Sequence, residues 1–280
     1  MSPIDPSLRI AGVRLAVSDL PGSVDFYSRV MGLQVLDGDA SRVLLGAGGA
    51  PALELVALED PRPAAHGSTG LFHVAWLHST RPALAETVRR IAGSGWPFTG
   101  ASDHAVSEAL YLDDPDGLGI EVYADRPRET WQPGADGQRV RMVTLPLDVE
   151  DLLAQHPAPP GAAIDPGAGI GHVHLKVADV PRAESFYRAL GFEEMARMPA
   201  AAFVSAGGYH HHVGLNSWQS AGGSPPGESS PGLREVSFEL EPAGVEALAG
   251  AAAELGAARR TAGAVTIGDP DGHMLSFRAR

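Results

Sequence analysis

The sequence predicts an α+β fold made of four short modules, and three observations support this. The pattern L-x-V-x-D-x-P, followed by Phe-Tyr and Gly, occurs at 15–32 and again at 175–191. The turn sequence Asp-Pro-Asp-Gly also occurs twice, at 114–117 and 269–272. The 34 Gly and 23 Pro among 280 residues favour many short strands joined by turns over long helices. An internal repeat of this kind indicates two copies of a unit of about 120 residues.

The expected elements follow the same order in both copies. A strand leads through Asp-x-Pro into a helix, because proline suits the first helical turn and glycine suits the end of a helix. Further strands, a second helix with apolar residues at helical spacing, and strands around Asp-Pro-Asp-Gly complete each copy. The order strand–helix–strands therefore occurs four times. The expected strands include 10–17, 71–77, 171–177 and 233–240, and the apolar helical patterns lie in 84–91 and 245–255.

Two domains and a linker follow from the repeat. We expect an N-terminal domain at 1–132, a linker at 133–168 and a C-terminal domain at 169–280. The linker is rich in Pro, Gly and Asp, apart from a helical candidate at 149–155.

Composition excludes several classes of function. The chain has 21 Lys and Arg against 34 Asp and Glu, a net charge of −13, whereas nucleic acids and anionic membranes are bound by basic surfaces. The chain has no cysteine, which excludes disulfides, thiolate nucleophiles and Cys-ligated metals. No stretch approaches the roughly 18 apolar residues of a membrane span, and no secretion signal is visible. We therefore expect a cytoplasmic protein that binds neither nucleic acid nor membranes.

Three polar residues stand inside otherwise apolar strands. They are His73 in LFHVAWL, Glu121 in GIEVY and His172 in IGHVHL. Burying such groups without partners is costly, so each needs a partner in the fold. If the three converge, they form a two-His, one-carboxylate set that leaves positions open on a divalent metal. Taken singly, each also fits a hydrogen-bonded core residue, and scattered histidines around a dead site are the alternative.

The repeat motifs resemble those of the vicinal oxygen chelate superfamily. This superfamily includes glyoxalase I, fosfomycin- and bleomycin-resistance proteins, and extradiol ring-cleaving dioxygenases. Three longer motifs resemble its catechol 2,3-dioxygenase-like branch: DHAVSEALYL at 103–112, YADRPR at 123–128 and GYHHHVGLN at 208–216. The resemblance implies four glyoxalase-like βαβββ modules that form curved mixed sheets around a metal pocket.

The resemblance also implies where the metal ligands lie. Family ligands occupy the first strand of a module and the carboxylate after Asp-Pro-Asp-Gly, which selects His73, Glu121 and His172 in modules two and three. The matching positions of modules one and four hold other residues, namely Gly12, Glu54, Glu235 and Ser276. Modules two and three must then face each other, within one chain or across a homodimer. Fe(II) is the metal that the dioxygenase branch implies, and Mn(II), Ni(II) or Zn(II) are the alternatives.

Further residues are candidates for the pocket around this metal. His174 lies two residues after His172, so both side chains point to one face of the strand. His210 and His212 are likewise expected to share a face, and the family implies an acid/base histidine there, for which we favour His212. Tyr111 matches the family's pocket tyrosine, which hydrogen-bonds the substrate oxygen. Four other histidines are expected to be solvated loop residues: His66, His78, His156 and His273.

Three functions remain open at this point. The first is an extradiol-type dioxygenase that opens a catechol-like aromatic with O2. The second is a glyoxalase I-like lyase or isomerase, with His210 or His212 as a fourth ligand. The third is a small-molecule-binding resistance protein without a metal.

Overall fold

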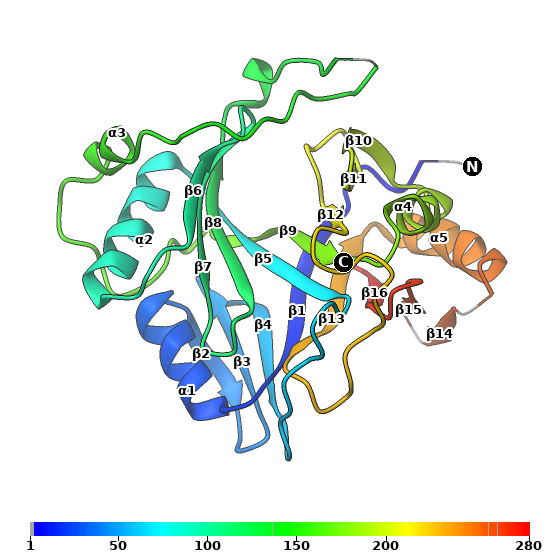
Figure 1. The fold of residues 1–280 in the computed structure, drawn as a ribbon, viewed down its shortest axis with the longest axis horizontal. Coiled ribbons are helices and arrows are strands. Elements are labelled where there is room, and N and C mark those ends of the chain that lie inside the picture. The colour runs from blue at the N-terminus through cyan, green and yellow to red at the C-terminus, as the bar shows by residue number, and fades with distance from the viewer. Residues whose placement is uncertain (1–2, 136, 257, 262) are drawn as a thin grey trace.

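The computed structural model describes residues 3–135, 137–256, 258–261 and 263–280, and its main feature is a pair of eight-stranded mixed sheets (Figure 1). The first sheet contains, in order across it, β14 (Arg259–Thr261), β15 (Ala264–Gly268), β16 (Met274–Ala279), β13 (Gly232–Leu240), β1 (Arg9–Val17), β4 (Ala50–Ala57), β3 (Arg42–Ala47) and β2 (Gln34–Gly38). The second contains β10 (Glu193–Met198), β11 (Ala201–Ser205), β12 (Val213–Asn216), β9 (Gly169–Lys176), β5 (Gly70–His78), β8 (Gly119–Asp125), β7 (Ser107–Asp113) and β6 (Gly100–Asp103).

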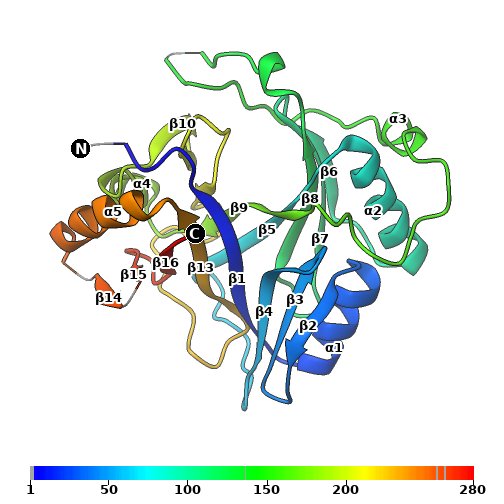
Figure 2. The ribbon, with the colours of Figure 1, turned by 180° about the vertical axis from the view of Figure 1, so that it is seen from behind.

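The helices complete four βαβββ modules, as the sequence predicts. They are α1 (Leu20–Asp25), which continues into the π-helical η1 (Phe26–Val30), α2 (Arg81–Ser94), α4 (Val180–Ala189) and α5 (Pro242–Glu254). Two short helical segments lie between modules two and three: the 3-10 turn η2 (Arg128–Thr130) and α3 (Val149–Ala154). Figures 1 and 2 show α1 and α2 gathered on one side of the molecule and α4 and α5 on the other.

The modules pair as one with four and two with three. In the first sheet β1 runs antiparallel to β13, and in the second β5 runs antiparallel to β9. Modules two and three therefore face each other within one chain, and the metal-ligand positions do not need a second copy to meet. Each sheet takes one module from either side of the linker. The domain and linker boundaries that we inferred from the repeat, 1–132, 133–168 and 169–280, stay a prediction.

The repeated motif Asp-x-Pro begins the first helix of modules one and three. The side chain of Asp19 accepts a hydrogen bond from the backbone N–H of Gly22, and Asp179 does the same for Arg182. These bonds satisfy N–H groups that a helix start leaves unpaired. Gly32, with φ 82°, ends the first of these helical segments, and a Cβ at this position would lie 2.7 Å from the backbone nitrogen of Ile164. Glycine is therefore required here.

The two repeated motifs contact each other. The hydroxyl of Tyr27 donates to Asp114 over 3.0 Å, and that of Tyr187 donates to Asp269 over 3.2 Å. All four side chains are largely buried. The Phe-Tyr motif of modules one and three thus holds the Asp-Pro-Asp-Gly turn of modules two and four. The turn in module two leads directly into the strand that carries Glu121.

Two histidines expected in solvated loops are buried. His78 is the last residue of β5 and is 2% exposed, and burial lowers its pKa to about 4. His273 is 5% exposed, and its Nδ1 lies 2.8 Å from Asp269. The expectation was wrong for both, because a position next to a turn in the sequence does not determine exposure, and both side chains are buried in the fold. His66 is exposed and His156 is partly exposed, and both lie outside strands and helices.

Substituting Asp114→Asn tests the effect of burial on the first of these turns. Burial raises the pKa of Asp114 to about 6. The folded chain therefore binds this proton more tightly than the unfolded chain, and stability falls as pH rises from about 4 to about 6. We expect the free energy of unfolding of Asp114→Asn, relative to the unsubstituted chain, to rise over that window by up to about 3 kcal/mol. Urea unfolding at both ends of the window measures it.

The matched turn in module four supplies the control. Burial would raise the pKa of Asp269, but His273 outweighs it and holds that pKa below its ordinary value, while the pKa of His273 is raised. The stabilisation from Asp269 is present above pH about 4, and that from His273 is present below about 6.5. Asp269→Asn should therefore destabilise the chain most between these values. The same pH dependence in both variants would contradict this account.

Candidate metal centre

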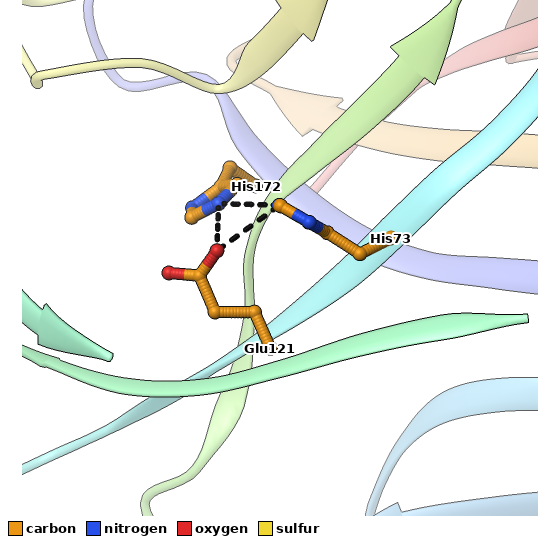
Figure 3. Close-up of side chains that lie close together, drawn as sticks. All are labelled: His73, Glu121 and His172. Carbon is orange, nitrogen blue, oxygen red and sulfur yellow. Dashed lines mark hydrogen bonds and ion pairs between the residues drawn. The ribbon is translucent and has the colours of Figure 1, made fainter. Parts of the chain in front are cut away.

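Three adjacent strands carry the three predicted ligands. His73 lies on β5, Glu121 on the neighbouring β8 and His172 on β9 at the other side of β5. Ala75 of β5 is opposite both Glu121 and His172 in register. Because side chains alternate along a strand, His73 shares the face of Ala75 and hence of the other two. Figure 3 shows the three side chains pointing toward one another.

The donor atoms of this triad lie close enough to bind one ion. Nε2 of His73 is 3.0 Å from Oε2 of Glu121 and 3.4 Å from Nε2 of His172. Nε2 of His172 is 3.3 Å from Oε2 of Glu121. Ligands at about 2.1 Å from a metal and at right angles to each other are separated by about 3 Å. Among the described residues, these are the His and carboxylate side chains that cluster in this way. The residues present therefore fit a divalent metal.

The protonation of the triad also suits a metal. All three residues are at most 5% exposed. Burial lowers the pKa of His172 to about 4, so this imidazole is neutral near pH 7. Burial would raise the pKa of Glu121, but His172 and His73 outweigh it and hold that pKa well below its usual range. A neutral imidazole and an ionised carboxylate are the forms that bind metal ions.

The fourth position around this centre is a glycine. His172 and His73 occupy matching places in modules three and two, so Gly214, opposite His174, matches Glu121, opposite Ala75. A Cβ on Gly214 would lie 2.8–3.1 Å from ring atoms of His174. The ring of His174 thus lies where a fourth ligand would extend. Module three would supply one ligand and module two would supply two, so a metal held there would keep other coordination positions open.

A cavity of about 390 Å³ surrounds the triad. Its walls are largely apolar, with Phe72, Phe203 and Trp218 on one part and Met142 and Val143 of the linker on another. His174 lines it, as predicted, and its ring packs against His73 at a centroid distance of 5.0 Å. Burial lowers the pKa of His174 well below its ordinary value. This imidazole is therefore neutral near pH 7.

Tyr111 lines the same cavity and is held by a histidine. It lies opposite Glu121 in the pairing of β7 with β8. Its hydroxyl is 2.6 Å from Nε2 of His104, whose Nδ1 is 2.6 Å from the carbonyl oxygen of Val143. A carbonyl only accepts, so Nδ1 of His104 carries a hydrogen and, in the neutral ring, Nε2 accepts from Tyr111. The linker is therefore joined to the wall of the cavity through this pair.

The triple histidine is arranged differently from the prediction. His211 lines the cavity, and its ring lies 4.0 Å from that of His172 between centroids. His210 points to Asp125 and His212 to Ser205, with nitrogen–oxygen distances of 2.9 and 2.8 Å. The assignment assumed strand alternation, but the strand begins only at Val213, so the rule did not apply.

Comparison with known proteins identifies the superfamily of this chain. Residues 9–122 and 169–277 match the glyoxalase/bleomycin resistance protein/dioxygenase superfamily. The chain belongs to this superfamily. It is 40% identical over 239 residues to the catechol-2,3-dioxygenase of Bacillus subtilis strain 168, which covers 83% of both chains. Among solved structures it resembles glyoxalase I from Zea mays, at a TM-score of 0.58 and 19% identity over 98% of this chain and 92% of that one. A Bacillus subtilis protein described as a candidate dioxygenase has a TM-score of 0.65 at 14% identity, covering 100% of this chain and 86% of that one.

The first sheet holds an arginine at the position equivalent to that of the triad in the second sheet. Arg14, opposite Glu54, matches Ala75, opposite Glu121. The guanidinium of Arg14 lies 2.5 Å from Glu54 and 3.4 Å from Glu235. A side-chain cation thus lies between the two carboxylates at this position.

Among the described residues, no helix is both long and apolar enough to cross a membrane.

Sequence reasoning did not identify three contributors to the site. The linker was treated as a connection only, yet Met142, Val143 and Thr144 line the cavity. Asp125 and His211 were also not singled out. The spacing of Glu121, Tyr123 and Asp125 on one strand would have indicated that Asp125 shares the face of the metal ligand.

The role of the triad in metal binding can be measured directly. His73→Ala should weaken Mn(II) or Fe(II) binding by more than about 100-fold, because loss of an outer partner alone costs 10–100-fold. Metal content after anaerobic loading and titration calorimetry give the two constants. His156→Ala, outside the site, is the matched control and should bind as the unsubstituted chain does. Unchanged metal content in His73→Ala would contradict the assignment.

Proposed function

We propose that this protein is an extradiol-type dioxygenase that opens a catechol-like ring with O2. The observation that carries the proposal is the three-ligand centre with Gly214 at the fourth position, in a cavity with aromatic walls. A substrate with two neighbouring oxygens and O2 together need open positions on one metal, and a three-residue set leaves them. The 40% identity to a catechol-2,3-dioxygenase supports the same reaction.

The metal that suits this reaction is Fe(II), held by His73, Glu121 and His172. When bound, it would lower the pKa of a catechol hydroxyl and supply the redox chemistry that ring opening with O2 requires. Mn(II) is compatible with the same ligands, and Ni(II) or Zn(II) would fit a lyase of the glyoxalase I type. That alternative needs a fourth ligand, whereas His210 and His212 are bonded away from the centre.

Two cavity residues would handle protons near the substrate. With a neutral His104 ring, Nε2 takes the hydroxyl hydrogen of Tyr111, so the tyrosine oxygen would accept from a substrate hydroxyl rather than donate to it. His211 takes the acid/base role that the resemblance assigns to this region, in place of His212 or His210. General acid–base groups of this kind contribute about 10²–10⁴-fold to rates.

The cavity lining points to an uncharged substrate. Among the described residues that line it there is no Lys or Arg, and the carboxylates there are Asp113 and Glu121. A carboxylate-bearing catechol would lose water contacts there without gaining a cationic partner. The proposed partners are thus a neutral small aromatic and O2, with no nucleic acid or membrane, in a cytoplasmic setting. A homodimer would not be needed to assemble the centre, because modules two and three pair within the chain.

Ring cleavage is the first test. Protein loaded anaerobically with Fe(II) should turn catechol into a yellow ring-opened product and consume one O2 per product, because both oxygen atoms enter it. His211→Gln should lower kcat by about 10²-fold or more, and His212→Gln should lower it less. Absorbance and an oxygen electrode give both rates. No O2 uptake across a panel of catechols would contradict the proposal.

Substrate charge is the second test. Neutral 4-methylcatechol should have a higher kcat/KM than protocatechuate, which carries a carboxylate, by about tenfold or more, because burying an unpaired charge costs over about 1.4 kcal/mol. The same comparison of the two substrates in Asp113→Asn is the control, because the carboxylate of Asp113 would repel the carboxylate of protocatechuate and cannot pair with it. Equal kcat/KM for both substrates would show that the lining does not select against charge.

A further inference from the structure

A chain of hydrogen bonds leads from the cavity to a carboxylate outside it. Nδ1 of His211 lies 2.7 Å from Nδ1 of His210, and Nε2 of His210 lies 2.9 Å from Oδ1 of Asp125. The same oxygen is 3.3 Å from the hydroxyl of Tyr209, which is 2.7 Å from that of Tyr123. None of these contacts involves a metal ligand.

The second sheet explains why these residues meet. Glu121, Tyr123 and Asp125 are spaced two apart on β8, so they share the face of the metal centre. Gly171 on β9 leaves room for Tyr123, since a Cβ there would overlap the tyrosine hydroxyl. Arg128 stabilises the loop that carries Tyr209 and the histidines, because its guanidinium donates to the carbonyl of Gly207 over 2.6 Å.

The hydrogens in this chain can be assigned from one end. An ionised carboxylate only accepts, so Nε2 of His210 carries a hydrogen and donates it to Asp125. In the neutral ring Nδ1 of His210 is then an acceptor. Nδ1 of His211 must donate to it, because two acceptors would not approach to 2.7 Å. This leaves Nε2 of His211 without a hydrogen.

We propose that Asp125 and His210 are positioning residues that hold His211 in its Nδ1–H tautomer. Nε2 of His211 is then a ready hydrogen-bond acceptor for a group in the cavity. The side chain of His210 is fully buried, whereas that of Asp125 is 25% exposed, so water can reach this pair only on the Asp125 side. A carboxylate that orients a histidine in this way sets which nitrogen can act as a base.

The catalytic consequence of this assignment rests on the proposed function, but the tautomer does not. ¹⁵N-histidine NMR of the chain loaded with diamagnetic Zn(II) distinguishes the two ring nitrogens of each histidine. In the unsubstituted protein His211 should show a protonated Nδ1 and an unprotonated Nε2. In Asp125→Ala the ratio of the Nε2–H to the Nδ1–H form of His211 should rise by about tenfold or more. Without Asp125, Nδ1 of His210 is no longer fixed as the acceptor for Nδ1–H of His211.

Two further variants keep the test sharp. Asp37→Ala, an exposed carboxylate of the first sheet paired with Arg42, should leave the tautomer of His211 unchanged. His210→Phe removes the acceptor while filling the space, so it should release the tautomer as Asp125→Ala does. It also provides the measurement if Asp125→Ala does not fold.

The kinetic readout separates this proposal from the function. With Fe(II) and catechol, Asp125→Ala should lower kcat by about tenfold or more and leave KM within about twofold, because Asp125 is not among the described residues that line the cavity. An Nε2–H tautomer in the unsubstituted protein, or an unchanged tautomer in both variants, would overturn the positioning role. An absence of ring cleavage with the expected tautomers would overturn the function and leave the positioning role standing.

Discussion

The antiparallel pairing of β5 with β9 is the constraint on which the site depends. It joins module two to module three and places His73 beside His172, although 99 residues separate them along the chain. Because β8 pairs with the other edge of β5, the same strand also sets the position of Glu121. The register determines the face of every residue, and a slip of one residue would turn His73 away from its partners. The hydrogen bonds of the ladder thus specify the geometry of the centre.

The two sheets share one architecture but carry different polar side chains at equivalent positions. In the second sheet a buried carboxylate and two imidazoles bring their donor atoms to one point. In the first sheet Arg14 supplies a fixed positive charge between two carboxylates. Burial of a carboxylate is costly unless a cation or hydrogen bonds compensate it. A side chain supplies that compensation at one position, and a metal suits the other.

The site could be predicted where its signals are local. The three residues of the triad are polar residues within apolar strands, and the repeat marked equivalent positions, so pattern and resemblance singled out His73, Glu121 and His172, which the fold brings together. The choice between His210 and His212 failed because His211 lies in a loop, where strand alternation does not apply. The wall formed by Met142 and Val143 was not predicted either, since a Pro- and Gly-rich segment carries no periodic pattern to indicate what it covers.

The sequence by itself determined the four modules, their helix starts and turns, and the residue types of the metal centre. These follow from caps, glycines of positive φ and alternating burial, which act over a few residues. Only the tertiary structure decided that modules two and three pair within one chain, that Gly214 occupies the fourth position, and that Asp125 reaches His211 through His210. These depend on contacts between segments distant in the chain, which local chemistry permits but does not choose.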